Sequence, residues 1–248
     1  MIAERIATCR SVMCTIIALV WHSGQASASL ANALESPYTS LYMNTQQILQ
    51  IKEWLGTGSI NIFGRPFAGK DTQGEKLAQL FDGVLMGGGD ILRNSTIPEH
   101  LDAILHRGEL IPSDDYVAIV LPYLSKEEYA SRPLLLSSVG RWIGEEQGVM
   151  AATKAAQHPL KCVLYIDIDE AMVMQRWSAL ESHDDRGGRY DDTAEILQKR
   201  LEEYRSKTLP VIEEYDRLGL LERIDGHGTP EEVHELILAC LLRRATSQ

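Results

Sequence analysis

The fold is decided by the stretch Gly64-Arg65-Pro66-Phe67-Ala68-Gly69-Lys70-Asp71-Thr72-Gln73. It has the spacing G-x-x-x-x-G-K, follows the apolar run Ile60–Phe63, and precedes a segment with helical periodicity. Gly64 and Gly69 permit positive φ, which lets successive backbone N–H groups curl around an anion. The first turn of the next helix adds unpaired N–H groups, and Lys70 adds a mobile positive charge. We therefore predict that this loop binds the phosphates of a nucleotide.

One position departs from the usual pattern, in which Ser or Thr follows the lysine and binds Mg²⁺. Here Asp71 follows Lys70, and Thr72 comes one residue later. Asp71 and Thr72 are the candidate Mg²⁺ ligands, with Asp71 approaching the metal directly or through water. The alternative is that Asp71 is only a carboxylate in the first turn of a helix, stabilised by the helix dipole. The sequence leaves both interpretations open.

The composition is that of an acidic globular protein. Of the 248 residues, 44% are hydrophobic, and the formal net charge is −11. This charge argues against a general nucleic-acid surface, which needs an excess of Lys and Arg. A few cations can still converge on a small phosphate ligand. The four cysteines show no metal-ligand spacing, which indicates reduced intracellular thiols: Cys9, Cys14, Cys162 and Cys240.

Residues 1–42 do not follow the pattern of the rest of the chain. Two arginines precede an apolar run at 12–21, and Ala26-Ser27-Ala28 follows it, as in a secretory signal. The run is too short to cross a bilayer as a helix. We favour a second interpretation, in which Met43 is the natural start and the extension is extra translated sequence, because a coherent helical pattern begins there. Either way we exclude the extension from the fold and expect a cytoplasmic domain, 43–248, without a membrane partner.

From residue 59 onward, short apolar runs alternate with segments of helical periodicity. The predicted strands are Ile60–Phe63, Val84–Met86, Pro133–Ser138, Cys162–Ile168 and Leu220–Ile224. The predicted helices are Thr45–Leu55, Thr72–Phe81, Pro98–His106, Asp114–Leu121, Gly144–Gln157, Glu170–Leu180, Thr193–Tyr215 with a kink at Pro210, and Pro230–Leu242. Strands separated by helices form right-handed crossovers, so we predict a doubly wound α/β fold with one five-stranded parallel sheet.

The loop ending Gly-Lys-x-Thr-Gln resembles the adenylate kinase family, and other motifs follow in that family's order. Gly88-Gly89-Asp90-Ile91-Leu92-Arg93 resembles the family's Thr-Gly-Asp-Met-Leu-Arg, and Ser137-Ser138-Val139-Gly140-Arg141 resembles Asp-Gly-Phe-Pro-Arg. The segment ending at Arg176 resembles the family's lid hinge, and Arg189-Tyr190-Asp191-Asp192 with Arg200-Leu201 is similar to Arg-x-Asp-Asp…Arg-Leu. The resemblance implies a P-loop NTPase-type fold with a small helical monophosphate-binding insertion at 88–132 and a short lid at 177–190.

The resemblance also implies roles for individual residues. The loop Gly64–Gln73 is expected to bind ATP with Mg²⁺, and Arg176 to contribute to that site. The expected catalytic residues are Lys70, Arg141, Arg176, Arg189 and Arg200. The expected acceptor-binding residues are Gly88, Arg93, Arg141, Gln147, Arg189 and Arg200. Phosphoryl transfer needs mainly positioning and positive charge near the γ-phosphoryl group, and guanidinium groups supply both through bidentate hydrogen bonds.

Three departures accompany this resemblance. Ser137 stands where the family has the aspartate that organises Mg²⁺, and Gly88 replaces a threonine on the acceptor side. Phe67 replaces a loop glycine, and we expect its side chain to point outward. Our hypothesis for the first departure is that Asp71 compensates for Ser137 by holding water around Mg²⁺.

These features predict a nucleoside monophosphate kinase, with ATP + AMP = 2 ADP and a monomer as family defaults. One alternative is a P-loop kinase of another small-molecule acceptor, such as a hydroxyl group, which needs a carboxylate base. A phosphate acceptor is already ionised, so the arginine-rich set favours the monophosphate. The other alternative is a nucleotide-binding regulator that has lost turnover, and the serine at position 137 is the argument for it.

Overall fold

A parallel sheet of five strands forms the centre of the computed structural model, in the order β2-β3-β1-β4-β5. The strands are Ser59–Gly64 (β1), Val84–Gly87 (β2), Leu134–Ser137 (β3), Leu160–Asp167 (β4) and Leu221–Asp225 (β5). The structure describes residues 43–88, 91, 94, 113–181 and 194–247. β1 pairs with both β3 and β4, in registers that place Ile60 beside Leu135 and Ile62 beside Leu164. The predicted doubly wound parallel sheet is therefore confirmed.

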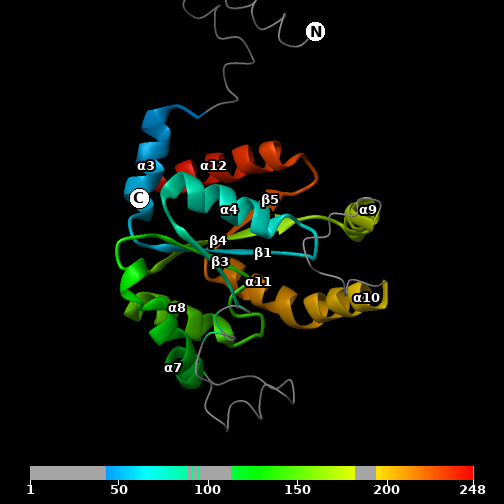
Figure 1. The fold of residues 1–248 in the computed structure, drawn as a ribbon, viewed down its shortest axis with the longest axis horizontal. Helices are drawn as coiled ribbons and strands as arrows, with labels where there is room; N and C mark the ends of the chain where they lie inside the picture. Colours follow the sequence, from blue (N-terminus) through cyan, green and yellow to red (C-terminus); the bar gives the residue numbers. More distant parts are fainter. Residues whose placement is uncertain (1–42, 89–90, 92–93, 95–112, 182–193, 248) are drawn as a thin grey trace, which may run out of the picture. The chain divides into compact units, whose positions relative to one another are not determined.

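Helices cover both faces of this sheet (Figure 1). One face carries α3 (Thr45–Leu55), α4 (Lys70–Phe81) and α12 (Pro230–Thr246). The other carries α7 (Ser113–Leu124), α8 (Glu145–Ala155) and α11 (Leu209–Arg217). The remaining elements are α9 (Glu170–Glu181), α10 (Ala194–Glu203), a 3₁₀ turn at Glu127–Tyr129 (η1) and a π-helical turn at Tyr204–Thr208 (η2). The predicted helix Pro98–His106 lies outside the described residues.

The strands are apolar on both sides because both sides are covered. Ile60 and Ile62 of β1 pack with α3, α4 and α12, whereas Phe63 faces the opposite layer, where its ring lies 5.9 Å from that of Tyr215 in α11. This alternation follows from the two-residue period of a strand. All six residues of β1 are buried, so the strand before the glycine-rich loop is held firmly from both layers.

Local signals set several helix boundaries. Thr229 caps α12 through the backbone N–H of Glu232, whose side chain returns a hydrogen bond, as the sequence Thr-Pro-Glu-Glu predicts. The sequence also predicts one helix over 193–215 kinked at Pro210. The structure instead has α10, the π-helical turn η2 and α11, with Pro210 in the first turn of α11. Proline is tolerated there because the N–H that it lacks would have no partner within α11.

The strand order reverses direction around β1. The chain moves from β1 outward to β2, returns to β3, and then continues on the other side through β4 and β5. Ligands of such sheets bind at the carboxyl ends of the strands, where this reversal opens a crevice. A ligand site is therefore expected at the carboxyl ends of β1, β3 and β4. Among the helices in the described ranges, none combines the length and apolar character needed to cross a membrane.

Candidate active site

The loop after β1 has an open side and a closed side. At Gly64 an added Cβ would lie 2.7 Å from the carbonyl oxygen of Ile166 in β4, so only glycine fits there. At Gly69, where φ is +89°, an added Cβ would meet nothing within 4 Å. Lys70 begins α4, and its Nζ donates to the carbonyl of Arg65 at 3.0 Å. The loop is thus packed against the sheet at one end and open at the start of α4, as a phosphate cradle requires.

Phe67 adopts φ +62°, the left-handed region that glycine enters most easily. Its ring is partly buried against the core between the sheet and α4, and the guanidinium of Arg200 lies 5.9 Å from the ring centroid. The expectation that this side chain points outward is wrong. Burial of the apolar ring offsets part of the free-energy cost of this backbone conformation.

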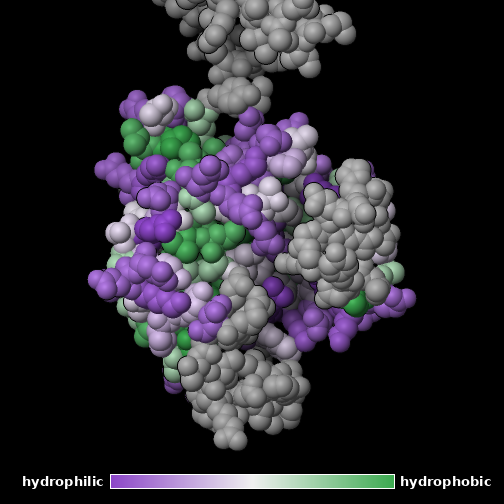
Figure 2. Space-filling view, viewed as in Figure 1, coloured by the Kyte–Doolittle hydropathy of each residue, from purple (hydrophilic) through white to green (hydrophobic). Residues whose placement is uncertain are grey.

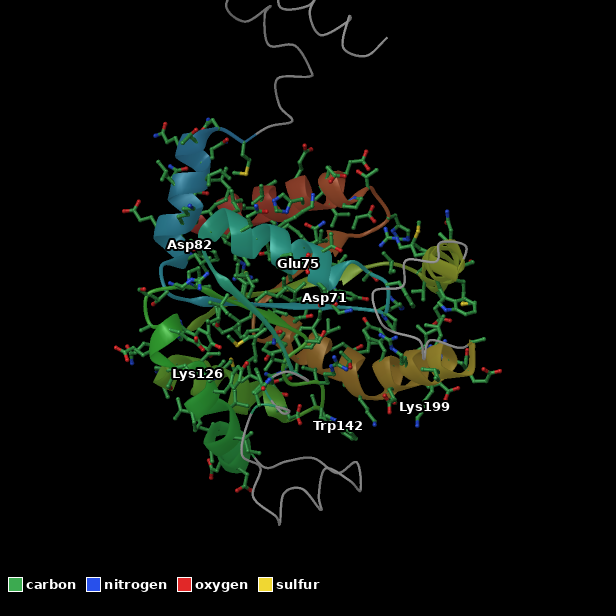
Figure 3. The ribbon with its side chains drawn as sticks, in the orientation of Figure 1. Asp71, Glu75, Asp82, Lys126, Trp142 and Lys199 are labelled. Atoms are coloured by element: carbon green, nitrogen blue, oxygen red, sulfur yellow. The ribbon has the colours of Figure 1, made fainter. Side chains whose placement is uncertain are left out.

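Asp71 and Ser137 meet at the open end of the loop. The Ser137 hydroxyl, at the end of β3, donates to Asp71 Oδ1 at 2.7 Å. Figure 3 shows Asp71 at the end of α4 that follows the loop, with Glu75 and Asp82 successively further along the helix. Asp71 and Thr72 are both exposed. The carboxylate that the sequence singles out therefore lies beside the cradle and is held by a strand-end hydroxyl.

Arg141 lies in the turn that follows β3. Its Nε donates to the carbonyl of Ser138 at 3.3 Å, and its backbone N–H donates to Glu145 at 2.8 Å. The side chain is exposed to solvent, yet protein atoms crowd it. This desolvation, followed by the charge of Arg200, lowers the pKa of Arg141, and nearby Asp71 partly opposes the shift. Arg141, Arg200 and Asp71 thus share one electrostatic environment at the carboxyl edge of the sheet.

The guanidinium of Arg176, in α9, is occupied by hydrogen bonds to backbone carbonyls. Its guanidinium donates to the carbonyls of Phe67 at 3.1 Å, Gly226 at 2.6 Å and Gly228 at 3.3 Å. These bonds tie the loop after β5 to the phosphate loop. Arg176 lies next to the phosphate loop, and its hydrogen bonds fix the shape of the site; its role in binding ATP stays a prediction.

Five further predicted residues contribute no described side chain to the open end of the loop. Arg93 and Arg189 lie outside the described residues. Gln147 is exposed in the first turn of α8. At Gly88 an added Cβ would lie 2.9 Å from the carbonyl oxygen of Ser138, so the family's threonine would fit there only if the backbone moved. Gln73 is buried, and its side-chain amide donates to the Pro230 carbonyl at 2.7 Å and contacts His234 at 3.0 Å, so this side chain serves to join α4 to α12.

Two residues have positioning contacts that the sequence analysis does not predict, although Arg65 is one of the residues expected to bind ATP. Asn61 in β1 holds both backbone groups of Val139, donating to its carbonyl at 2.7 Å and accepting from its N–H at 3.2 Å. The signal for it is a single amide within an otherwise apolar strand. Arg65 donates to Asp167 at 3.1 Å and to the Ile168 carbonyl at 2.7 Å, which fixes the loop against the end of β4.

The chemistry available at this edge is anion binding and phosphoryl transfer. Lys70 and two arginines converge beside a backbone cradle, and a carboxylate and a hydroxyl are present for a hydrated metal ion. Mg²⁺ prefers oxygen ligands and keeps several waters, so it is usually held by one or two carboxylates together with substrate phosphates. In the part of the chain that the structure describes, no group of three or more His, Cys, Asp or Glu is arranged so that it could hold a metal ion by itself. The donor set therefore fits Mg²⁺ that arrives with a nucleotide.

The strand order, the loop and the cation cluster define a P-loop phosphotransferase. Residues 62–220 match the family described as adenylate kinase. The adenylate kinase of Thermus thermophilus is 32% identical over 193 residues, which cover 75% of this chain and 99% of the relative. Those of Synechococcus sp. RCC307 and Gemmatimonas aurantiaca are 33% and 32% identical, covering 72% and 73% of this chain and 95% and 98% of the relatives. This chain belongs to the adenylate kinase family.

Proposed function

We propose that the chain is an ATP-dependent nucleoside monophosphate kinase that moves the γ-phosphoryl group of ATP to AMP. The observation that supports this most strongly is the set of cations at the carboxyl edge of the sheet. Lys70 lies at the start of α4, and Arg141 lies close enough to Arg200 for the charge of Arg200 to lower its pKa. Adenine is the proposed acceptor base because the similar relatives named above are adenylate kinases.

In this proposal the chain's own residues bind, orient and shield the reacting groups. The loop 64–73 holds the ATP phosphates, and Lys70 leaves the Arg65 carbonyl to meet the β- and γ-phosphates. Arg141 orients the acceptor phosphate, which needs no general base because it is already ionised. Arg200, together with Arg93 and Arg189, neutralises the charge that develops during transfer. Mg²⁺, bound with ATP, supplies further charge neutralisation.

The remaining parts of the proposal concern organisation. Residues 88–132 form the monophosphate-binding insertion, and 177–190 form a short lid that excludes water from the transferring group. The protein works as a cytoplasmic monomer, and residues 1–42 take no part in the domain. Small nucleotides are its partners, and the net charge of −11 disfavours nucleic acid.

An assay of ADP release from ATP with AMP, CMP, UMP, GMP or dTMP, and with the corresponding unphosphorylated nucleosides, tests this function. We expect turnover with AMP, and a loss of about 10²- to 10³-fold in kcat for Lys70→Met. Lys76→Met is the matched control, since Lys76 lies on the same helix but pairs with Glu231 at the surface, and we expect its kcat to stay at the wild-type level. Turnover only with unphosphorylated acceptors, or ATP binding without turnover, would replace this proposal with one of its two alternatives.

A further inference from the structure

The hydrogen-bonded pair Asp71–Ser137 is unusual in the placement of its two groups. Asp71 directly follows Lys70 in the first turn of α4, and Ser137 is the last residue of the neighbouring strand β3. In P-loop proteins the residue after the lysine is usually a hydroxyl that binds Mg²⁺, and the carboxylate comes from a strand. Here the helix carries the carboxylate of Asp71 directly after the lysine, with the Thr72 hydroxyl one residue later, and the strand end carries the hydroxyl of Ser137.

The geometry brings the helix carboxylate and the strand-end hydroxyl into direct contact. The two side chains meet at 2.7 Å although 66 positions separate them in the sequence. This contact forms only because β3 lies next to β1 in the sheet. One carboxylate oxygen of Asp71 accepts from Ser137. In the described ranges no other hydrogen bond to this carboxylate is present, and Asp71 is exposed to solvent.

We propose that Asp71 is the carboxylate that holds the hydrated Mg²⁺ of bound ATP, and that Ser137 orients it. This inference rests on the proposed function, because it requires ATP in the loop. It resolves the choice that the sequence leaves open between a metal-directed carboxylate and a simple helix-end charge. A carboxylate that served only the helix dipole would need no partner from another strand.

The proposal has a consequence for ATP binding that is independent of turnover. A carboxylate beside the phosphates repels metal-free ATP and attracts the Mg²⁺ complex, since charges at such separations interact strongly near a protein surface. Asp71 should therefore make ATP affinity more dependent on Mg²⁺. An isolated helix-end carboxylate that does not face the metal should leave this dependence unchanged.

The experiment measures the Kd of ATP by calorimetry in excess Mg²⁺ and in EDTA, for the full chain and for Asp71→Asn. We expect the ratio of the Kd in EDTA to the Kd in excess Mg²⁺ to fall about tenfold in Asp71→Asn, mainly because metal-free ATP binds more tightly. Glu75→Gln is the matched control: it removes an exposed carboxylate from the same helix, one turn further from the loop (Figure 3), and should leave the ratio unchanged. An unchanged ratio in Asp71→Asn overturns the inference.

An exchange of the two groups provides a second test. The double variant Asp71→Ser, Ser137→Asp moves the carboxylate to the strand end and should recover the wild-type ratio, whereas Asp71→Ser, Ser137→Ala should not. Equal ratios in the two double variants overturn the inference. If wild type binds ATP in neither condition, the proposed function itself fails. If ATP binds but Asp71 does not affect the Mg²⁺ dependence, only the inference fails.

Discussion

At the scale of single residues, two positions near the phosphate loop have backbone conformations that their side chains disfavour. Phe67 has φ +62° and Ser138 has φ +52°. Both stand where the resembling motifs have glycine, which explains the family's choice, since a Cβ in the left-handed region costs about 1–2 kcal/mol. The chain tolerates this cost because Phe67 packs its ring against the core and Ser138 is fixed by the bond from its N–H to the Ile62 carbonyl at 3.0 Å.

Comparison of two substitutions at Phe67 isolates the backbone cost. Both Phe67→Ala and Phe67→Gly remove the ring, but only glycine also removes the conflict at positive φ. We expect Phe67→Gly to be more stable than Phe67→Ala by about 1 kcal/mol in the free energy of unfolding measured in urea. At an ordinary position with negative φ the order is the reverse, so greater stability of the alanine variant would contradict this account.

At the scale of elements, Asn61 connects β1 to the turn that carries Arg141. Its amide satisfies both the N–H and the carbonyl of Val139, and all of these groups are buried. The turn after β3 therefore depends on a side chain from the next strand in the sheet. Arg141 follows two residues later, so its position at the cleft is set through this link.

Replacement of Asn61 by Leu should affect both stability and catalysis. It leaves two buried backbone groups unpaired, which costs about 1–3 kcal/mol each, and it frees the turn that holds Arg141. We expect lower stability in urea and a lower kcat with AMP. Leu241→Ala, a buried residue in the second half of α12, is the control for stability alone. If both variants lose stability but keep wild-type kcat below their unfolding range, Asn61 has no positioning role.

The loop between β5 and α12 contains a pH-sensitive contact. His227 Nδ1 lies 2.7 Å from Asp225 Oδ1, and Nε2 lies 3.6 Å from Asp169. The hydrogen bond to Asp225, with the charges of both aspartates, raises the pKa of His227, and the same hydrogen bond lowers the pKa of Asp225. The protonated imidazole is therefore favoured in the folded protein.

The sign of the pH effect follows directly from the raised pKa of His227. Its contribution to stability is fully present below the unfolded pKa of about 6.5 and disappears as the pH rises through the higher folded value. We expect the Tm difference between wild type and His227→Gln to be larger at about pH 5.5 than at about pH 8.5. Thermal unfolding of both proteins across this range measures it, and a pH-independent difference would refute the pairing.

At the scale of the whole molecule, apolar side chains concentrate in the interior and hydrophilic side chains cover most of the visible surface. Figure 2 shows hydrophilic residues over most of the visible described surface, with apolar groups in limited areas. The interior consists of one apolar layer on each side of the sheet. Cys162 in β4 and Cys240 in α12 are buried there as free thiols.

These two thiols should report global unfolding. Burial raises the pKa of Cys162 and raises that of Cys240 to about 12, so neither is a thiolate at neutral pH in the folded state. We expect iodoacetamide to alkylate them at least about a thousandfold more slowly in buffer than in urea, because reaction requires unfolding. Mass spectrometry of the two peptides measures this rate, and rapid labelling in buffer would show that α12 opens locally.

The sequence alone determined most of the described secondary structure, the glycine-rich loop and the family resemblance, but not the division of residues 194–217 into α10, η2 and α11. These are local properties: the loop is a continuous run of residues, and strand and helix periods are visible within short windows. For this reason the five strands fall within two residues of their predicted positions at each end, and the helix predicted to begin at Thr72 begins at Lys70, two residues earlier.

Only the tertiary structure decided which side chains meet. The bond between Asp71 and Ser137 joins positions 66 apart, Asn61 reaches Val139 across 78 positions, and Arg176 reaches Phe67 across 109. Such contacts depend on strand order and register, which local periodicity does not specify. The backbone contacts of Arg176, the inward packing of Phe67 and the role of Asn61 followed from that arrangement.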